Sequence, residues 1–370
     1  MKMHAAALHE YGQPMVVEEI EIDDPKQGEV LVKLAASGVC YSDYIFVEGK
    51  PLFESPRPIV LGDEGAGVVE KVGPGVTTVK PGDHVVMSWM YMCGQCRYCT
   101  VGRPNLCDVG RGPEIGQGYL ADGTTRMHKG STPYYHFIGI STMAEYSVAS
   151  ENSVIKIDSD IPLDKAALLG CAVMTGVGSV INTAKVETGA SVAVFGAGGV
   201  GISAIQGAVL SGAYPIIAVD TRANKLEFAK KFGATHTVDA SKTDPVQEIR
   251  NITGVGADYT FEATGNVKVM RQAFEAAGRG GKAIVIGAAG IGDEVSINAL
   301  DFPFTEKSLI GSGYGSARLR VDIPRLLNLY KAGKLKLDEM VTQTYPLVDV
   351  NRAFDDLREG KNIRGVLVMD

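Results

Sequence analysis

The sequence predicts an α/β protein in two parts, a β-rich N-terminal part and a doubly wound parallel sheet that follows it. Residues 1–170 contain short strand-like segments separated by glycine and proline turns, a pattern typical of a compact, barrel-like β domain. From residue 191 on, apolar strand-like runs alternate with helical segments, as a parallel sheet requires. The 370 residues, 45% of them hydrophobic, are enough to form two domain cores.

The clearest unit is the stretch 191–220, SVAVFGAGGVGISAIQGAVLSGAYPIIAVD. Its first five residues predict a buried strand, and a G-x-G-x-x-G turn, a helix and a second strand follow. In such a turn the first glycine permits the bend, the second lets a pyrophosphate approach, and the third lets helix and strand pack closely. The helix N-terminus then offers free N–H groups and partial positive charge to that pyrophosphate. The residues predicted to bind a dinucleotide here are Gly196, Gly198 and Gly201, with Gly199 in the same turn.

The second strand ends on Asp220, 19 residues after Gly201. A carboxylate at this position accepts hydrogen bonds from ribose hydroxyls and repels a 2′-phosphate, so the sequence favours NAD over NADP. Arg222 weakens this preference because an arginine pairs with such a phosphate. The alternative is an ordinary α/β unit that binds no nucleotide.

Four cysteines, Cys93, Cys96, Cys99 and Cys107, form a C-x₂-C-x₂-C-x₇-C pattern. Four thiolates on one short lobe fit a closed tetrahedral Zn²⁺ site. Because such a site has no open position, its role is structural and its metal affinity contributes to folding. An iron–sulfur cluster is the main alternative.

Charge and targeting features limit the classes of function. The net charge of −7, with no basic cluster, argues against nucleic-acid binding. Neither a membrane-spanning run nor a signal peptide is recognisable, and the clustered cysteines favour metal in a reducing compartment. We therefore expect a cytosolic protein.

The chain order predicts further elements. Strands are expected at residues 29–34, 66–72 and 84–87 before the cysteines, and at 144–148 and 153–157 after them. Residues 108–135 read as a loop rich in Gly, Asp and Thr, either a lid or a solvated surface excursion. Residues 163–184 are helical in character, and the last segment adds helices at 323–331 and 350–358 and a strand at 365–369.

Several stretches resemble the zinc-dependent alcohol dehydrogenases of the medium-chain dehydrogenase/reductase superfamily, over the full length and in the family's order. They are GVCYSD at 38–43, GDEGAGVVEKVGPGV at 62–76, the four-cysteine lobe, LLGCAVMTGVG at 168–178, the glycine turn, and NIRGVLV at 362–368. The long segment after Cys107 is similar to the branch of liver-type and glutathione-dependent formaldehyde dehydrogenases.

The resemblance implies a GroES-like catalytic domain and a Rossmann NAD-binding domain in a homodimer or homotetramer. The implied ranges are 1–172 for the catalytic domain, with the zinc lobe at about 90–110, then 173–312 for the Rossmann domain and 313–370 for a return to the catalytic domain. It also implies NAD-dependent oxidation of a primary alcohol, or reduction of the aldehyde, assisted by zinc.

The resemblance assigns roles residue by residue. Cys40 and Cys171 match ligands of the catalytic zinc, Ser42 the hydroxyl that takes the alcohol proton, and Glu64 the carboxylate behind the metal. The matching cofactor contacts are Thr175 and Val200 for the nicotinamide, Asp220 and Lys225 for the ribose, and Arg364 for the pyrophosphate. Trp89 and Ile138 match residues that line the substrate channel.

Two residues depart from the family pattern. The motif G-H-E, whose histidine is the third zinc ligand, reads Gly62-Asp63-Glu64 here, and Ile45 replaces the histidine that ends the proton relay. Asp is an accepted zinc ligand, but with two thiolates it leaves the centre at −1, so the metal polarises substrate less. Asp43, which matches the acid behind the ligand histidine, becomes a second negative charge facing Asp63.

Three interpretations of the catalytic site follow. Zinc held by Cys40, Asp63 and Cys171 is favoured, since all three are competent ligands. The others are zinc with Glu64 as an added ligand, and a catalytic site without metal, natural or created by a His→Asp substitution.

Bulky apolar residues predict the substrate class. Tyr44, Ile45, Trp89 and Ile138, with Phe46 and Tyr134, favour primary alcohols carrying aromatic or medium-chain apolar groups. Of these, Phe46 is better explained as a core residue. Arg111, just after Cys107, is either an anchor for an anionic group of the substrate or a solvated side chain. Two other functions stay open: a zinc-independent NAD(P)H reductase of activated C=C or C=N bonds, and a non-catalytic nucleotide-binding protein.

Overall fold

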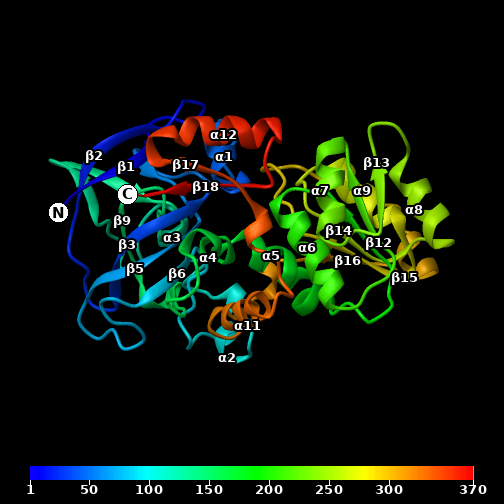
Figure 1. Cartoon of the computed structure of the whole chain (residues 1–370), viewed down its shortest axis with the longest axis horizontal. Helices are drawn as coiled ribbons and strands as arrows, with labels where there is room; N and C mark the ends of the chain where they lie inside the picture. Colours follow the sequence, from blue (N-terminus) through cyan, green and yellow to red (C-terminus); the bar gives the residue numbers. More distant parts are fainter. Residues whose placement is uncertain (370) are drawn as a thin grey trace. The chain divides into compact units, whose positions relative to one another are not determined.

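The computed structural model describes residues 1–369 and divides into two units. The first unit comprises Met1–Cys171, Arg318–Tyr330 and the residues from Leu337 on. The second unit comprises Ala172–Ala317 and Lys331–Lys336. Figure 1 labels the elements of each unit along the chain.

The first unit contains a closed barrel with the strand order β1-β2-β7-β8-β4. Side chains along β1 alternate at first between exposed and buried, and its antiparallel partner β2 directs Ile20 and Ile22 into the same core. Barrel closure depends on the parallel pairing of β4 with β8. The five strands are β1 (Lys2–Leu8), β2 (Val16–Ile22), β4 (Ile59–Val60), β7 (Met127–Lys129) and β8 (Thr132–His136).

A second sheet in this unit has the order β10-β6-β5-β3-β18-β17, and β9 also pairs with β3. The ten-residue β3 is almost entirely buried because it pairs with β5, β9 and β18. Its strands are β3 (Glu29–Gly38), β5 (Glu64–Val72), β6 (His84–Ser88), β9 (Tyr146–Ser150), β10 (Val154–Lys156), β17 (Val341–Pro346) and β18 (Arg364–Val368).

Short helices connect these strands. The helix α1 follows β3 directly and buries Tyr44, Ile45 and Phe46 in an apolar cluster. The α-helices of the first unit are α1 (Tyr41–Val47), α2 (Arg97–Thr100), α3 (Pro113–Gly116), α4 (Leu163–Ala166), α11 (Leu319–Lys331) and α12 (Val350–Glu359). Its 3₁₀ turns are Pro104–Leu106, Glu151–Ser153, Ala167–Gly170, Asp338–Met340 and Leu347–Asp349.

The segment expected as one loop at 108–135 is more ordered than predicted. It contains α3, all of β7 and most of β8. Arg126, which is fully buried, anchors its end through hydrogen bonds to Glu29 on β3 and to Asp122. The strands β7 and β8 are short and polar, and barrel pairing rather than an apolar pattern defines them.

The second unit is built on a six-stranded parallel sheet with the order β13-β12-β11-β14-β15-β16. The inner strand β11 is buried along its whole length, which explains its continuous apolar run, and β14 is buried except at Asp258. The strands are β11 (Val192–Phe195), β12 (Ile216–Asp220), β13 (His236–Asp239), β14 (Ala257–Glu262), β15 (Ala277–Val285) and β16 (Ser308–Gly311).

Helices connect consecutive strands of this sheet, as expected for a doubly wound fold (Figure 1). They are α6 (Gly199–Leu210), α7 (Ala223–Lys231), α8 (Pro245–Thr253) and α9 (Val267–Ala276), with α10 (Asp301–Thr305) before β16. The unit also contains α5 (Ala172–Gly178), a π-helical turn (Ser179–Ala184) and a 3₁₀ turn (Tyr314–Ser316).

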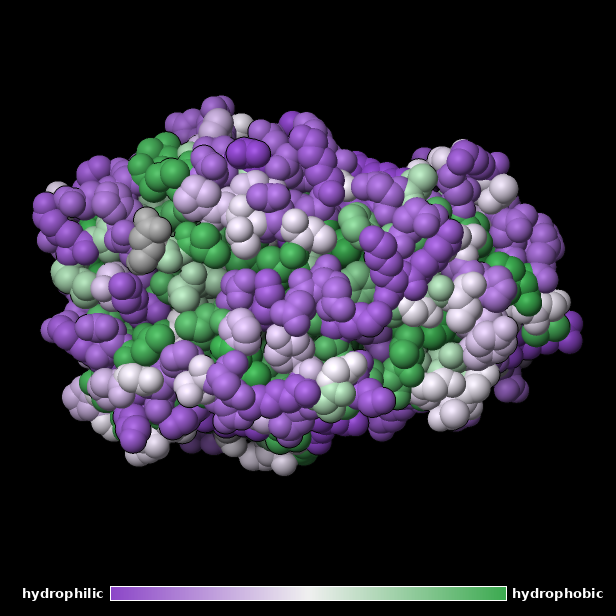
Figure 2. Space-filling view, viewed as in Figure 1, coloured by the Kyte–Doolittle hydropathy of each residue, from purple (hydrophilic) through white to green (hydrophobic). Residues whose placement is uncertain are grey.

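Over residues 1–369, no single helix is long and apolar enough to cross a membrane, although the bent pair Leu163–Gly170 and Ala172–Ala184 passes on length and composition. On the face that Figure 2 presents, hydrophobic and hydrophilic residues are interspersed.

Candidate active site

The first predicted ligand, Cys40, lies between the end of β3 and the start of α1. It has extended backbone angles and is 5% exposed, so its thiol faces the interior of the first unit. The next turn of chain presents Ser42 and Asp43 from α1. Asp43 is fully buried, and its Oδ1 accepts a hydrogen bond of 2.9 Å from the backbone N–H of Gly62. Asp43 thus fixes the turn that precedes Asp63.

Asp63 lies directly before β5 and is 1% exposed. Gly62 has a φ of 108°, a conformation that favours glycine, and a Cβ there would lie 2.5 Å from Thr142 Oγ1. This tight turn directs the Asp63 carboxylate toward α1, where the hydroxyl of Ser42 donates to Oδ2 at 2.5 Å. The other oxygen, Oδ1, is buried and has no hydrogen-bond partner in the described chain.

Cys171 occupies the break between a 3₁₀ turn and α5, with φ −144° and ψ −75°. Its neighbour Gly170 packs against the first unit's sheet, since a Cβ there would lie 2.3 Å from the carbonyl oxygen of Met87. The structure brings Cys40, Asp63 and Cys171 together, with one ligand atom of each within 4.8 Å of the others. We call these three residues the ligand triad.

The ligand triad fits a zinc ion. Zn–S bonds of about 2.3 Å in a tetrahedral site place sulfurs about 3.8 Å apart, within the observed spread. All three residues are buried, and the unpartnered Oδ1 of Asp63 is an oxygen that a cation would satisfy.

The pKa values of Cys171, Asp63 and Asp43 are all raised, a shift that a bound cation would oppose. The hydrogen bond from Cys171 holds the pKa of Cys40 well below its ordinary value, and the same contact raises the pKa of Cys171. Burial, then the charge of Cys40, raises the pKa of Asp63 to about 7. Burial and the neighbouring Asp63 raise the pKa of Asp43. Protein groups alone therefore cannot keep all these acids ionised together.

Glu64, the predicted carboxylate behind the metal, forms a buried ion pair with Arg364 of β18. Their side chains are 0% and 3% exposed, and Arg364 Nε has no partner among residues 1–369. A Cβ at Gly38 would collide with the Glu64 carboxylate, so β3 provides the room for it. The sequence did not predict this pairing, since Arg364 was expected to contact a pyrophosphate.

The four cysteines of the lobe also converge, with sulfurs within 4.8 Å of one another. Backbone N–H groups point at these sulfurs, from Cys93 to Cys107 and from Cys96 to Cys93, both at 3.3 Å. Hydrogen bonds from the backbone, Cys99 first, lower the pKa of Cys96 to about 6. Thiolate-stabilising N–H groups around four close sulfurs fit a tetrahedral zinc.

Two predicted substrate residues lie on backbone that adjoins the ligand triad, although Trp89 and Ile138 pack in different apolar clusters. Trp89 follows Ser88, which pairs with Glu64 across β5 and β6. Residues 137–143 run beside 60–62, through backbone hydrogen bonds such as Thr142 N–H to Gly62 O. Within that segment Ile138 adopts a φ of 43°, a strained conformation for a β-branched residue and one often found at functional sites.

The other bulky candidates divide into two groups. Tyr44 and Ile45, both 8% exposed, and the core residue Phe46 belong to the cluster that also packs Ile138. Tyr134 does not: it lies in the barrel core, where its hydroxyl donates to Glu18, so its assignment to the channel was wrong. The alternation of β8 turns Tyr134 inward. Arg111 is exposed, yet its guanidinium lies 5.2 Å from the centre of the Trp89 ring and donates to the carbonyl of Asn105.

In the second unit the glycine turn has the predicted form. Gly196 has a φ of 91°, and a Cβ at Gly201 would lie 1.7 Å from the Gly196 carbonyl oxygen, so both positions need glycine. Gly198 caps α6, and a Cβ there would meet no atom of residues 1–369 within 4 Å. The open space at Gly198 and the start of α6 form a cradle that fits a pyrophosphate.

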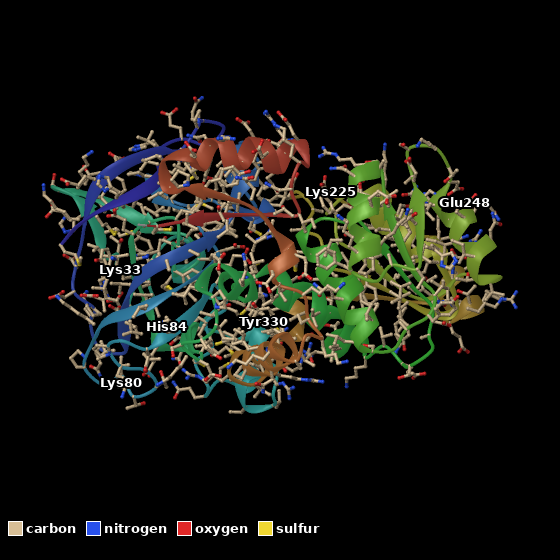
Figure 3. All side chains as sticks on the ribbon, in the orientation of Figure 1. Lys33, Lys80, His84, Lys225, Glu248 and Tyr330 are labelled. Atoms are coloured by element: carbon tan, nitrogen blue, oxygen red, sulfur yellow. The ribbon has the colours of Figure 1, made fainter. Side chains whose placement is uncertain are left out.

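Asp220 ends β12 beside this turn. Its Oδ2 accepts from the N–H of Ala197 at 2.8 Å, and its Oδ1 from the N–H of Arg222 at 2.9 Å. Lys225 lies on α7 (Figure 3) and is 7% exposed; burial lowers its pKa to about 8. Thr175 lies on α5, 9% exposed, and its carbonyl accepts a hydrogen bond from Ser179.

Sequence reasoning missed Glu262, at the carboxyl end of β14. Its Oε1 accepts from the N–H of Thr264 at 2.6 Å, from the Thr264 hydroxyl and from the N–H of Gly265. Thr264 in turn packs on the dinucleotide turn, 2.7 Å from a Cβ placed at Gly196. An acid at the end of a buried strand was the available signal.

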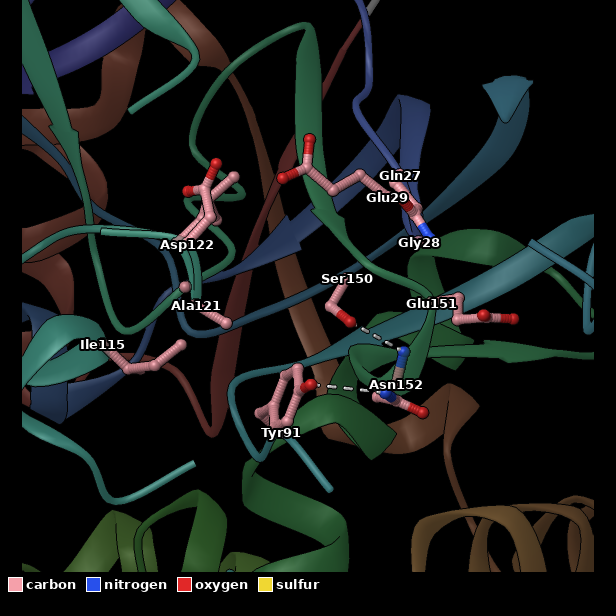
Figure 4. A pocket seen from close by; sticks show the side chains of 12 residues that line it. Gln27, Gly28, Glu29, Tyr91, Ile115, Ala121, Asp122, Ser150, Glu151 and Asn152 are labelled. Atoms are coloured by element: carbon pink, nitrogen blue, oxygen red, sulfur yellow. Dashed lines mark hydrogen bonds between the residues drawn. The ribbon is translucent and has the colours of Figure 1, made fainter. Parts of the chain in front are cut away.

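A cavity of about 310 Å³ lies elsewhere in the first unit (Figure 4). Figure 4 shows that Asn152 is hydrogen-bonded to Ser150 and Tyr91 on one side of the cavity. Asp122 lies on the opposite side. Its acidic residues are paired, Glu29 with Arg126 and Glu151 with Thr78. None of the predicted site residues is among those that line it.

Comparisons with known proteins assign the family. The model of the "Alcohol dehydrogenase GroES-like domain" matches residues 26–159, and that of the "Zinc-binding dehydrogenase" matches residues 199–332. The chain is 44% identical to the S-(hydroxymethyl)glutathione dehydrogenase of Paracoccus denitrificans over 377 residues, covering 100% of both. It is 45% identical to the NDMA-dependent alcohol dehydrogenase of Amycolatopsis methanolica over 374 residues, covering 100% of this chain and 99% of that one.

Among solved structures, the benzyl alcohol dehydrogenase of Acinetobacter calcoaceticus superposes with a TM-score of 0.94 at 34% identity, with full coverage of both chains. These matches confirm the predicted family, the two-part α/β fold, and the zinc and NAD cofactors. The chain belongs to the zinc-dependent alcohol dehydrogenases of the medium-chain dehydrogenase/reductase superfamily, in the branch of the liver-type and glutathione-dependent formaldehyde dehydrogenases, and is an NAD-dependent oxidoreductase.

Proposed function

We propose that this enzyme oxidises primary alcohols with aromatic or medium-chain apolar groups, and reduces the matching aldehydes, at a zinc site whose third protein ligand is Asp63. The observation that carries the proposal is the buried triad of Cys40, Asp63 and Cys171, with its unpartnered carboxylate oxygen. Zinc in that position supplies Lewis acidity toward the alcohol oxygen, and NAD supplies the hydride acceptor.

The chain's own residues hold the ligands and move the proton. Ser42 donates its single proton to Asp63, so its oxygen is left as an acceptor for the hydroxyl proton of the substrate. Arg364 neutralises Glu64, which supports a structural role for Glu64 over metal ligation. The four-cysteine lobe would hold the structural zinc.

Cofactor binding is proposed for the glycine turn of the second unit. The turn residues Gly196 to Gly201 would hold the pyrophosphate, Asp220 and Lys225 the ribose, and Thr175 and Val200 the nicotinamide. Asp220 already accepts an N–H from the turn, and its negative charge favours NAD over NADP.

The substrate class rests on apolar surroundings. Trp89 and Ile138 lie on backbone that adjoins the triad, and Tyr44 and Ile45 pack with Ile138 in one cluster. Such walls favour aromatic and aliphatic groups over charged ones.

A second candidate substrate is an S-hydroxymethyl thiol adduct with a carboxylate tail. Arg111 supports it, because its guanidinium lies over Trp89 and could anchor an anion. Against it, Arg111 already donates to the carbonyl of Asn105 from both Nε and Nη2, and burial lowers its pKa. We therefore rank it second.

A substrate panel tests the proposal. Benzyl alcohol and octanol are expected to give a kcat/KM at least about tenfold above that of S-(hydroxymethyl)glutathione, about 1.4 kcal/mol in transition-state binding. R111A should leave benzyl alcohol oxidation within about twofold, with R103A, an exposed arginine nearby, as the matched control. A preference for the glutathione adduct that R111A removes would establish the second candidate instead.

Metal content separates the dehydrogenase from a zinc-independent reductase. About two zinc ions per subunit support the proposal, since the closed lobe fills in either case. About one zinc, with NADH-dependent reduction of activated C=C or C=N bonds, would refute it. The proposed homodimer or homotetramer is tested by sedimentation equilibrium.

A further inference from the structure

We propose that Ser42 positions Asp63 as a metal ligand, in addition to its contact with substrate. The inference rests on the proposed catalytic zinc and concerns the residues behind it. It starts from one contact, the hydrogen bond of 2.5 Å from the Ser42 hydroxyl to Oδ2 of Asp63. A ligand carboxylate held in this way presents its other oxygen in one fixed direction.

The two carboxylate oxygens of Asp63 have different environments. Oδ2 accepts from Ser42, whereas Oδ1 is buried with no partner among residues 1–369. Asp63 is 1% exposed, so Oδ1 is shielded from bulk water. The division assigns Oδ2 to orientation and leaves Oδ1 for the cation shared with Cys40 and Cys171.

Asp43, the neighbouring acid, does not perform this task. Its Oδ1 accepts from the backbone N–H of Gly62, and its Oδ2 has no hydrogen-bond partner in the described chain. Neither oxygen of Asp43 is therefore hydrogen-bonded to Asp63. A hydroxyl is the group that can donate to a ligand carboxylate, and Ser42 supplies it.

Orienting contacts of this kind strengthen metal binding. Removal of a residue that orients a ligand typically lowers metal affinity or activity 10- to 100-fold. We therefore expect S42A to raise the dissociation constant of the triad metal about 10- to 100-fold, and S42T, which keeps the hydroxyl, to stay within about threefold of wild type. The loss concerns metal affinity and is measured without turnover.

The experiment uses the full-length holoenzyme, with zinc counted per subunit and Co²⁺ titrated into the triad site against a chromophoric chelator. Thiolate-to-cobalt absorption reports binding there. The four-cysteine zinc is the internal control, because it must remain at about one per subunit if S42A folds.

A second background isolates the contact. In D63H a metal-bound imidazole presents an N–H and no free acceptor, so Ser42 has nothing to donate to. S42A should then change the metal affinity of D63H by less than about threefold, and the double-mutant cycle gives the coupling directly.

The outcomes are distinct. An unchanged metal affinity in S42A, or an equal loss in the D63 and D63H backgrounds, overturns the role of Ser42 and leaves the proposed function standing. A wild type that holds one zinc per subunit and takes up no Co²⁺ at the triad overturns both.

Discussion

Two glycines of the turn in the second unit, Gly201 and Gly198, are expected to be needed for different reasons, one for folding and one for cofactor binding. A Cβ at Gly201 would lie 1.7 Å from the Gly196 carbonyl oxygen, more than an ångström inside any contact that real Cβ atoms make. A Cβ at Gly198 would meet nothing within 4 Å in residues 1–369, and its backbone angles of −79° and −170° suit any residue. Gly201 is therefore required by the protein, whereas we predict that Gly198 is required by the cofactor.

Alanine substitutions turn this difference into numbers. G201A overpacks the turn, at a cost of about 1–3 kcal/mol, so we expect the melting temperature without cofactor to fall by about 3–10 °C. G198A should leave that temperature within about 1 °C, because the added methyl enters open space. In the complex the same methyl would displace the pyrophosphate, and a similar overpacking cost raises the NADH dissociation constant about 10- to 100-fold.

The assay is a thermal unfolding scan without cofactor and a fluorescence titration with NADH, on wild type and both variants. Wild-type NADH affinity in G198A would refute the cradle that we assign to this turn. A fall in melting temperature for G198A as large as that for G201A would refute the distinction between fold and ligand.

Three further predictions concern stability, the lobe and pH. E29Q removes one of the two carboxylates that pair with the fully buried Arg126, the other being Asp122, and should lower the unfolding free energy by about 2 kcal/mol in a urea titration. K2Q, which breaks an exposed pair with Glu19, should leave the unfolding free energy unchanged; equal costs would contradict this. C107S should remove one zinc per subunit, as measured by elemental analysis, and make the four-cysteine lobe sensitive to limited proteolysis. NADH affinity should stay unchanged, because the glycine turn belongs to the other unit. A full zinc content in C107S would contradict this prediction. Burial lowers the pKa of Lys225 to about 8, so the side chain loses its charge as pH rises through that value, and NADH affinity should fall between pH 7 and pH 9. In K225R the side chain stays protonated, so this decline should be absent. K230R, which changes an exposed lysine on the same helix, is the control.

Local chemistry explains which parts of the fold could be predicted from the sequence. The strand, turn and helix around Gly196 were predicted because the apolar run, the glycine spacing and the helix are contiguous. The helix α1 was missed because its aromatic and β-branched residues, such as Tyr44 and Ile45, have low helix propensity, and burial in the apolar cluster determines its conformation instead. The alanine-rich β1 was missed because pairing with β2 and β4, not β propensity, makes it a strand.

The candidate site shows the same limit. The family resemblance was enough to select Cys40, Asp63 and Cys171 as ligands, and the structure brings them within reach of one ion. Their role as ligands stays a prediction until metal is measured. The partners of these residues could not be predicted, because Ser42 and Asp63 lie 21 residues apart, and Glu64 and Arg364 lie 300 apart. Only the tertiary fold, which places β5 and β18 on either side of β3 and brings Asp63 to α1, defines such pairs.

Asp63 and Ile45, the two residues predicted to depart from the family pattern, both affect the hydrogen bonding of the Ser42 hydroxyl. Ile45 lies one helical turn beyond Ser42 and is buried in an apolar cluster, so a proton on Ser42 finds no acceptor in that side chain. Asp63 provides an oxygen acceptor on the other side of the same hydroxyl, at 2.5 Å. A histidine ligand at 63 would donate to its surroundings rather than accept, and would leave the Ser42 proton free for an outward path. In this chain the Ser42 hydroxyl therefore donates to Asp63, and Ile45 offers it no alternative acceptor.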